Sequence, residues 1–469
     1  MSVLQTYSLN RQLQQADWDI ILGYTRRVRE LSQLYHGCRL TADCFEQLST
    51  PPSSTVLIFP KLRSLALHSP LKPIARFVRQ FISPVLTDLT FFHAKRLGSI
   101  HAFGEGCLNV KYFTVAGGEP WADPDMISDL ICHWPNLLYV YCQQVDLNVA
   151  AIAHLSCLHS LDYLLFQLHD EVVEQIQSCQ SGTAVLTFAT LRTLSINLES
   201  LASGWRFFHH LRLPAIEELT VQLYAMPTML DIMSFLAGLQ ATCAHDTLCN
   251  FALLLREHNS FDSDYEFNED PPQYHIASDH LRPLTVFTNI QSITINLRCG
   301  VDLDERVLLC LAASWPRIDY FAVYDTQPRT EATGITPGGL VQLLERCRSL
   351  RILYVNFDVR GYTEPPQGHP WRGLRMPERA RLHLQNSPIE EESVYVLGVF
   401  FHVAPYPDFQ LDTRWKDFDF LDDEIVPEEL CDVYHDRWQR VHALACKLWQ
   451  ERGALRRSLL ARFSDNNVL

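Results

Sequence analysis

The sequence is poor in positive charge and has no long hydrophobic run. Lys and Arg total 39 against 54 Asp and Glu, so the 469 residues carry a formal charge of −15. A general nucleic-acid binder needs a basic face for its phosphate contacts, and this balance excludes that class. The longest apolar run, Val394–Ala404, is far short of the roughly 20 residues that a membrane helix needs. We therefore expect neither a nucleic-acid partner nor a membrane partner.

Signals of secretion are also missing. No N-x-S/T sequon occurs, and Met1–Ile20 contains no apolar leader. The chain has 14 cysteines, but most of them sit in or beside apolar runs, where a free cysteine behaves as a small hydrophobic residue. A chain of this size needs no disulfides to hold its core together. We therefore expect a reduced, soluble protein of the cytoplasm or nucleus.

Motifs of enzymes are absent as well. The sequence contains no G-x-x-x-x-G-K-[ST], H-E-x-x-H, G-x-S-x-G or C-x-x-C motif. Cys243, His245 and Cys249 are of metal-ligating types but lack a matching second pair, so ordinary core cysteines are favoured over a zinc site. The acidic stretch Glu257–Gln273 lacks the spacing of a calcium loop and indicates an exposed loop. We expect no catalytic residues, no metal and no cofactor.

A repeated strand pattern is present instead. Leu130–Val145 indicates the end of a helix, a stop at Trp134-Pro135 and a strand with Leu137, Val140 and Cys142 facing inward. The same spacing of three apolar residues recurs along the chain and predicts eleven strands. Their first apolar positions are Leu62, Leu86, Val110, Leu137, Leu161, Leu191, Ile216, Leu248, Ile290, Ile318 and Leu350.

The intervals between these positions are 24, 24, 27, 24, 30, 25, 32, 42, 28 and 32 residues. Leucine-rich repeats have periods of about 20–29 residues, each with a strand and a helix or 3₁₀ turn. Helical stretches do separate the strands, at 73–81, 126–133, 171–178, 229–239, 306–313 and 339–347. The pattern predicts an α/β fold, an irregular leucine-rich-repeat solenoid whose curved parallel sheet carries helices on its convex side.

The ends of the chain differ from the repeats. Asp17–Tyr35 has apolar residues at helical spacing, and we expect residues 1–55 to form an N-terminal helical cap. Residues 56–400 form the predicted solenoid of about eleven repeats. The last part, 401–469, combines an acidic segment with a long helix from about Pro427 to Phe463, and this helix caps the open end of the core.

The concave face of such a solenoid is the predicted binding surface. Between the inward positions of each strand lie residues rich in Tyr, Thr, Ser, Asn and Gln and nearly free of Lys and Arg. Tyr is common on any β surface, but it also supplies contact area with a polar tip, which suits a protein partner. The candidate partner-binding residues are Tyr112, Tyr139, Tyr141, Gln143, Tyr163, Gln167, Asn197, Tyr320, Tyr324 and Tyr354.

These features together resemble a family, the F-box proteins with leucine-rich repeats that are numerous in mushroom-forming fungi. The resemblance rests on Asp17-Trp18 with the run Tyr24–Leu31, on Phe59–Leu65, and on the strand entries at Trp134-Pro135 and Trp315-Pro316. It covers nearly the whole chain, although other intracellular repeat proteins share the strand pattern. It implies recognition of a protein substrate for ubiquitination.

The F-box itself is missing from this resemblance. In the family it is a helical module of some forty residues, normally opened by a Leu-Pro motif, that docks on a Skp-type adaptor. Sixteen residues precede Asp17, which is too few for the module. We therefore expect adaptor binding only if an F-box lies upstream. The alternative hypothesis is a stand-alone interaction scaffold unrelated to ubiquitin.

Overall fold

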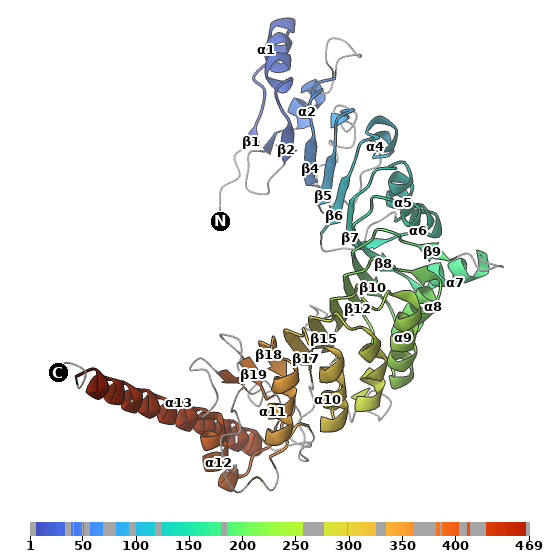
Figure 1. The fold of residues 1–469 in the computed structure, drawn as a ribbon. Coiled ribbons are helices and arrows are strands. Elements are labelled where there is room, and N and C mark those ends of the chain that lie inside the picture. The colour runs from blue at the N-terminus through green and yellow to red at the C-terminus, as the bar shows by residue number, and fades with distance from the viewer. Residues whose placement is uncertain are drawn as a thin grey trace. The chain divides into compact units, whose positions relative to one another are not determined.

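The structure, a computed structural model, describes residues 6–32, 39–40, 42–48, 50, 57–68, 81–92, 100–117, 124–179, 185–256, 276–297, 299–324, 334–359, 362, 381–384, 387–402, 410–412 and 428–465. The chain divides into two compact units. Unit 1 comprises Met1–Glu199 and Arg206–Ile216, and unit 2 comprises Ser200–Trp205 and Glu217–Leu469. Each unit is built around parallel strands that are joined by helices (Figure 1).

In unit 1 the main sheet has the strand order β2-β4-β5-β6-β7-β8-β10, and every described pair in it is parallel. Two short parallel pairs, β1-β3 and β9-β11, accompany it. The elements are β1 (Thr6–Tyr7), α1 (Gln15–Thr25), β2 (Glu30–Ser32), β3 (Arg39–Leu40), α2 (Ala42–Leu48), β4 (Ser64–His68), β5 (Asp88–Phe92), α4 (His101–Gly106), β6 (Tyr112–Ala116), α5 (Pro124–Cys132), β7 (Tyr139–Asp146), α6 (Val149–Ser156), β8 (Tyr163–Leu168), α7 (Asp170–Cys179), β9 (Leu186–Thr187), β10 (Thr193–Leu198), α8 (Leu201–Phe208, which spans the unit boundary) and β11 (Leu211–Arg212).

In unit 2 the sheet continues the same construction with the order β12-β13-β15-β17-β18-β19-β20, again parallel throughout. One short parallel pair, β14-β16, lies beside it. The elements are β12 (Glu218–Leu223), α9 (Met229–Thr242), β13 (Asn250–Leu255), β14 (Ile276–Ala277), the 3₁₀ helix η3 (Ser278–Val286), β15 (Ser292–Asn296), β16 (Val301–Asp302), α10 (Glu305–Ser314), β17 (Tyr320–Val323), α11 (Pro337–Arg346), β18 (Ile352–Tyr354), β19 (Arg381–His383), α12 (Glu391–His402), β20 (Gln410–Asp412) and α13 (Glu428–Asp465).

The apolar triplets of the sequence form the core of both units. All eleven predicted strands are present, as β4, β5, β6, β7, β8, β10, β12, β13, β15, β17 and β18. Their predicted inward residues are buried, for example Leu137, Val140 and Cys142, which have no exposed surface. Because one strand and its helix cannot bury their apolar edge alone, each repeat completes the core of its neighbour. The predicted α/β leucine-rich-repeat solenoid is confirmed as a fold class.

The helices begin where short polar side chains can cap them. Asn148, Thr228, Asp304 and Thr336 each accept a hydrogen bond from a backbone N–H of the first turn, as N-cap residues do. The predicted helices at 126–133, 171–178, 229–239, 306–313 and 339–347 correspond to α5, α7, α9, α10 and α11. The helix predicted at 73–81 lies almost wholly outside the described residues, as does the acidic stretch 257–273.

The N-terminal segment differs from its predicted form. A helix was predicted over Asp17–Tyr35, whereas α1 ends at Thr25 and Glu30–Ser32 is a strand that pairs with β4. Trp18 is the buried residue of α1. The apolar residues that followed helical spacing up to Leu31 therefore serve two elements, and the sheet begins inside the segment that we expected to be purely helical.

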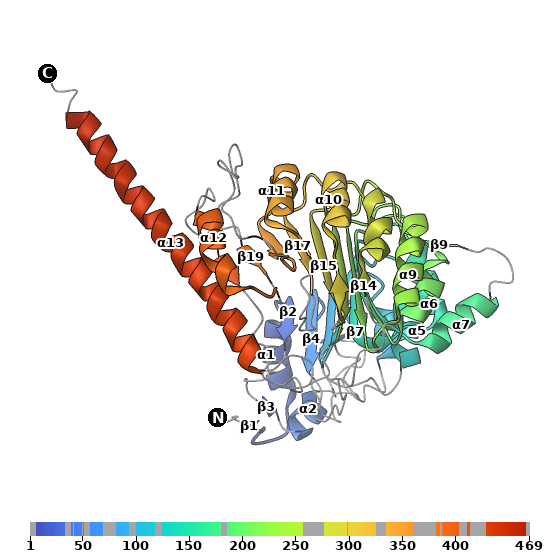
Figure 2. The same ribbon diagram turned by 90° about the horizontal axis from the view of Figure 1, so that it is seen from below.

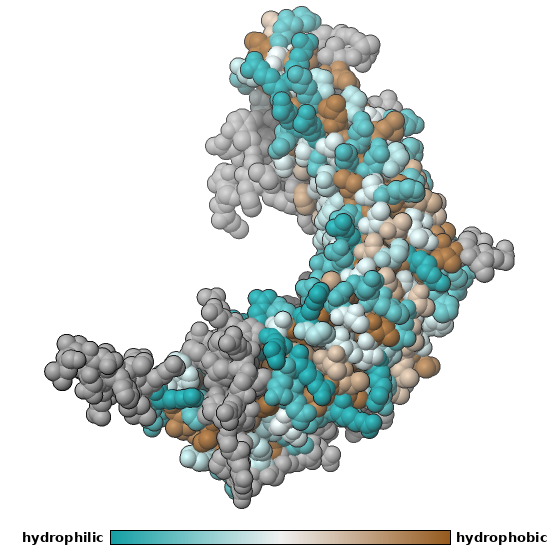
Figure 3. All heavy atoms as spheres, viewed as in Figure 1, coloured by the Kyte–Doolittle hydropathy of each residue, from teal (hydrophilic) through white to brown (hydrophobic). Residues whose placement is uncertain are grey.

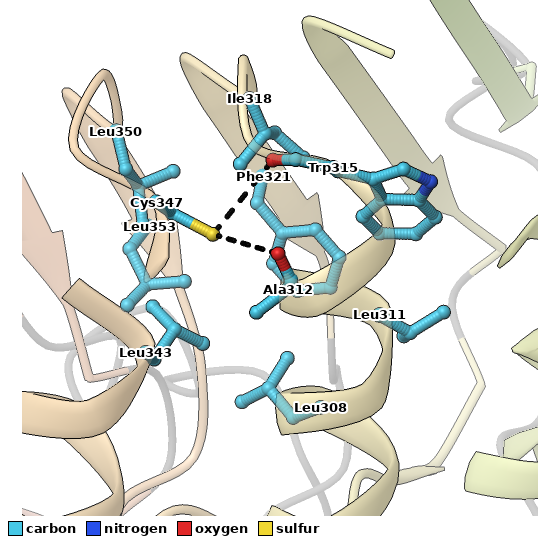
Figure 4. Close-up of a pocket in the computed structure, with 10 residues that line it drawn as sticks. All are labelled: Leu308, Leu311, Ala312, Trp315, Ile318, Phe321, Leu343, Cys347, Leu350 and Leu353. Carbon is cyan, nitrogen blue, oxygen red and sulfur yellow. Dashed lines mark hydrogen bonds between the residues drawn. The ribbon is translucent and has the colours of Figure 1, made fainter. Parts of the chain in front are cut away.

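Helix ends in unit 2 are packed by cysteine and tryptophan. Cys347, at the C-cap of α11, is close enough to donate its thiol hydrogen to the carbonyls of Ala312 and Trp315, at 3.6 and 3.9 Å (Figure 4). Burial raises the pKa of Cys347 to about 12, so the thiol stays protonated. Leu308, Phe321 and other apolar side chains surround a cavity here of about 10 Å³, at most the space of one water molecule. This is core packing rather than a ligand site.

The C-terminal helix covers the last part of unit 2. Helix α13 packs along α12 (Figure 2), with Trp438 fully buried and its Nε1 donating to the Ser387 carbonyl at 2.8 Å. Arg440 and Arg437 both reach Glu391 at the start of α12. These contacts supply the apolar cover that the end of a repeat core needs. The separate C-terminal cap that the sequence predicts for residues 401–469 stays a prediction.

Candidate functional site

Each sheet has one face covered by helices and one face that we call the open face. In Figure 1 the helices α4, α5 and α6 of unit 1 lie along the same side of their strands. Alternate strand residues point to the opposite side. Parallel pairing then aligns equivalent residues of neighbouring strands about 4.8 Å apart. A side-chain type that repeats at one strand position therefore forms a continuous row.

Three tyrosines form such a row on the open face of unit 1. Tyr112 pairs in register with Tyr139, and Tyr139 with Tyr163. The rings of Tyr139 and Tyr163 stack, with centroids 4.3 Å apart and planes 16° apart, whereas Tyr112 and Tyr139 lie 6.5 Å apart and tilted. Tyr112 is 45% exposed and the other two are half-buried. We call these residues the tyrosine row.

The hydroxyl group of Tyr139 is held in its neutral form. Burial raises the pKa of Tyr139 above its ordinary value, which a hydrogen bond with Tyr163 partly offsets and the charge of Tyr141 reinforces. A neutral phenol both donates and accepts hydrogen bonds. The row therefore offers flat apolar rings with polar edges.

Beyond Tyr141 the middle strand of this row, β7, bulges. From Tyr141 to Asp146 β7 advances five residues, while the paired positions of β8 advance only two, from Leu165 to Gln167. The extra residues form a bulge, a device that bends a strand and re-aims its side chains. Within it the Tyr141 hydroxyl donates to Gln143 Oε1 at 3.0 Å. We call residues 142–146 the β7 bulge.

The β7 bulge changes the position of one predicted site residue. Asn197 was expected on the binding face, but it is buried with only 1% of its surface exposed. Its Nδ2 donates to the backbone carbonyl of Gln143 at 2.7 Å, although 54 residues separate them in sequence. Asn197 therefore holds the bulge through a buried hydrogen bond. A partner on the open face would contact Gln143 rather than Asn197.

Unit 2 has an aromatic group of its own, the unit 2 cluster, formed by Tyr320, Tyr324, Tyr354 and His383. Tyr354 is at its centre, with ring centroids 3.9 Å from His383, 4.7 Å from Tyr324 and 6.3 Å from Tyr320. The hydroxyl groups of Tyr320 and Tyr324 are 3.2 Å apart and share a hydrogen bond. Burial raises the pKa of Tyr320. All three predicted tyrosines of this unit are therefore together, and all are half-buried.

A charged group that the sequence did not reveal lies at the carboxyl ends of β7, β8 and β10 in unit 1. His169 Nε2 is 2.9 Å from Asp146 Oδ2, and His169 Nδ1 contacts Glu199 Oε1. Burial by itself lowers the pKa of His169, but Asp146 and Glu199 outweigh it and hold the pKa above its ordinary value. The predicted site residue Gln167 lies beside them, with Nε2 3.4 Å from His169 Nε2.

These groups line a pocket of about 530 Å³ whose charged residues are mostly acidic. Asp125, Asp146, Glu171 and Glu199 contribute carboxylates, and His169 is the one side chain of the lining that can carry positive charge. No group of three or more His, Cys, Asp or Glu that could hold a metal ion occurs in the described part of the chain. Near the sequence-derived zinc candidate, Cys243 is buried at the C-cap of α9 and His245 contacts a backbone carbonyl.

The surface carries no single dominant apolar area on the side drawn in Figure 3, where brown residues lie in small groups among teal and white ones. Exposed large apolar side chains are scattered, among them Tyr24, Leu108 and Leu230. Scattered exposure of this kind is normal for a protein surface. Among the described helices, none combines the length and the apolar character required to cross a bilayer.

Comparison with known proteins yields likeness of structure only. No protein-family profile and no curated protein sequence matches the chain. Among solved structures, the yeast Rad7–Elc1 complex aligns at 14% identity over 76% of this chain and 83% of the other, with a TM-score of 0.38. The leucine-rich-repeat protein LegL7 from Legionella pneumophila aligns at 12% over 68% and 96%, with a TM-score of 0.33. A TLR13–ssRNA13 complex aligns at 13% over 87% and 65%, with a TM-score of 0.33.

Proposed function

We propose that this chain is a non-catalytic repeat protein that captures a protein partner on the open face of its sheet. The observation that carries the proposal is the tyrosine row, which places three aromatic rings with polar edges side by side on an exposed sheet. Aromatic residues that combine apolar area with a polar tip are enriched at protein interfaces. The described open-face positions of β5 to β10 also contain no Lys or Arg, whose flexible side chains would lose more entropy on binding.

The cellular setting that we propose is substrate recognition for a ubiquitin ligase. Its support is the resemblance of Asp17-Trp18, Tyr24–Leu31, Phe59–Leu65 and the two Trp-Pro strand entries to F-box proteins with leucine-rich repeats. In this setting a Skp-type adaptor binds an F-box upstream of the repeats, and the tyrosine row holds the substrate. The competing proposal is a stand-alone scaffold that binds the same partner without leading to its modification.

The first prediction concerns the open face and uses a photo-crosslinking amino acid in place of Tyr141. We expect ultraviolet light to trap one discrete protein, because Tyr141 lies beside the tyrosine row. The matched control carries the same crosslinker at Tyr395, which is 64% exposed on α12 and belongs to the helix layer. Mass spectrometry identifies the trapped protein. The double variant Tyr139→Ala, Tyr163→Ala should lose the crosslink, whereas Tyr395→Ala should keep it.

Equal crosslinking from both positions would contradict the proposal, because it would show that capture does not depend on the open face. Once the partner is known, its cellular level separates the two settings. Depleting this chain should raise the abundance of a ligase substrate and lower its ubiquitination. An unchanged abundance would favour the stand-alone scaffold.

A further inference from the structure

The contacts of His169 connect three successive repeats of unit 1. Asp146 ends the β7 bulge, His169 follows β8, and Glu199 follows β10. The two imidazole nitrogens divide between the two carboxylates, with Nε2 on Asp146 at 2.9 Å and Nδ1 on Glu199. Only a protonated imidazole donates a hydrogen bond from both nitrogens. The geometry of two carboxylates on one ring is therefore that of an imidazolium ion.

The backbone on both sides of His169 depends on the same contacts. The second oxygen of Glu199 accepts the backbone N–H of Asp170, at the first turn of α7, at 3.2 Å. Next to Asp146, the Leu147 N–H donates to the Gln167 carbonyl at 3.4 Å, a long bond. At the other end of the bulge, the Gln143 carbonyl accepts from Asn197. The position of the β7 bulge is thus set by a buried amide at one end and by an ion pair at the other.

Other carboxylates near His169 further favour the protonated form of its imidazole. Asp125 from α5 and Glu171 from α7 line the same pocket, and Asp170 adjoins the histidine on its own helix. No Lys or Arg belongs to the pocket lining. Asp146 Oδ1 is buried and has no hydrogen-bond partner among the described atoms. Loss of the imidazole proton therefore leaves a partly buried carboxylate without its counter-charge, which is unfavourable.

We propose that His169, Asp146 and Glu199 form a proton-dependent clamp, the His169 clamp, that holds the β7 bulge in place while the histidine is protonated and releases it when the proton is lost. The consequence for binding rests on the function proposed above. The bulge carries Gln143, which the Tyr141 hydroxyl contacts, so the clamp controls whether the polar end of the open face is ordered. Partner capture then becomes weaker as the pH rises.

The direction follows from the protonation equilibrium of His169. Its pKa in the folded chain lies above the ordinary value of 6.5. Below pH 6.5 the imidazole is charged in both the folded and the unfolded chain, so the clamp contributes in full. As the pH rises through the elevated pKa, the contribution is lost. The clamp is thus closed under mildly acidic conditions and opens on the alkaline side.

Hydrogen exchange of the free protein tests the clamp without any partner. We expect the protection factors of the Leu147 and Asp170 amides, corrected for intrinsic exchange, to fall about tenfold between about pH 6 and about pH 9, because the clamp opens as His169 loses its proton. In His169→Gln this dependence on pH should disappear. The matched control is His154→Gln, because His154 is a half-buried histidine of the preceding repeat whose Nε2 contacts the Trp134 carbonyl and no carboxylate of the described residues.

Protection that does not depend on pH in the wild type, or that changes equally in His169→Gln, would overturn the proposal. A second variant covers the case in which His169→Gln does not fold. Glu199→Gln keeps the shape of the side chain but removes one charge, so the midpoint of the His169 titration followed by NMR should shift to lower pH. An unchanged midpoint would also refute the clamp. Failure of the crosslinking experiment at Tyr141 would leave these results untouched, because none of them involves a partner.

Discussion

The two units carry the same residue type on the same face of the same kind of sheet, yet their tyrosines are arranged differently. In unit 1 the tyrosines occupy one strand position in three successive strands, so the rings form a row and two of them stack with their planes 16° apart. In unit 2 Tyr320 pairs with Ile352, while Tyr354 pairs with Ala322. These two rings are therefore diagonal neighbours, 6.3 Å apart and tilted by 43°.

This difference shows that the register of the strands determines what a tyrosine contributes. In the tyrosine row the rings stack along the sheet, and Tyr112 at one end of the row stays 45% exposed. In the unit 2 cluster the rings lean on one another and on His383, and the Tyr320 and Tyr324 hydroxyls bond to each other. The first arrangement keeps one of its rings, Tyr112, exposed to a partner, whereas all three tyrosines of the second are half-buried. We therefore assign capture to unit 1 before unit 2.

The largest loss of stability is expected at the tryptophans that end helices in the two units. Trp134 and Trp315 are equally buried, at 0% and 1% exposure, and replacing either with Ala should cost about 3–5 kcal/mol. Phe substitutions distinguish them. Trp315 Nε1 donates to the Leu284 carbonyl at 3.3 Å, while Trp134 Nε1 has no partner among the described atoms. Trp315→Phe should therefore destabilise more than Trp134→Phe by about 1 kcal/mol, measured by urea unfolding. Equal losses would show that this hydrogen bond contributes nothing.

A smaller loss of stability is expected when one central ring is removed from each group. Tyr354 contacts three described aromatic rings and Tyr139 contacts two. Each ring pair contributes about 0.5–1.5 kcal/mol beyond area burial, so Tyr354→Ala should lower stability more than Tyr139→Ala by about that amount. Partner capture should show the opposite order, with the larger loss in Tyr139→Ala. If Tyr354→Ala abolished capture and Tyr139→Ala did not, our assignment of binding to unit 1 would be wrong.

The smallest effect concerns single hydroxyl groups. Tyr320→Phe removes the bond to Tyr324 and should cost about 0.5–1.5 kcal/mol. Tyr112→Phe is the matched change in unit 1, where no described hydrogen bond involves the Tyr112 hydroxyl, so its stability should stay unchanged within a few tenths of a kcal/mol. Its capture of the crosslinked partner should fall instead. Urea unfolding and the crosslinking yield, measured on the same preparations of both variants, test this prediction.

Much of the fold was predictable because the core residues of each repeat recur at a short, fixed spacing in the sequence. Three apolar residues at fixed spacing predicted eleven strands. The side chains of such a triplet can be buried only when neighbouring repeats stack on one another. The pattern did not predict strands β2, β19 and β20. Their sequences, Glu-Leu-Ser, Arg-Leu-His and Gln-Leu-Asp, contain only one apolar residue each. Helix α6 was missed for the opposite reason. Its sequence is apolar nearly all round and shows little periodicity.

The candidate site divides in the same way. Tyr112, Tyr139 and Tyr163 were predictable, since residues that alternate with buried ones must face away from the core. The burial of Asn197 was not, because it follows from a bulge on a strand two places away in the sheet. Nor was the His169 clamp, whose members come from the ends of three different strands and share no motif. His383 joined the unit 2 cluster through a strand that the pattern missed.

The amino-acid sequence alone determined the fold class, the inward residues of most strands and the composition of the open face, because each of these depends on neighbours within about ten residues. The register between strands that are distant in sequence determined the remaining contacts. It decided which tyrosines stack, which asparagine is buried and which carboxylates contact His169. A shift of one residue turns a side chain to the other face, and a bulge of a few residues brings Asp146 opposite Gln167. These contacts exist only once the repeats have stacked.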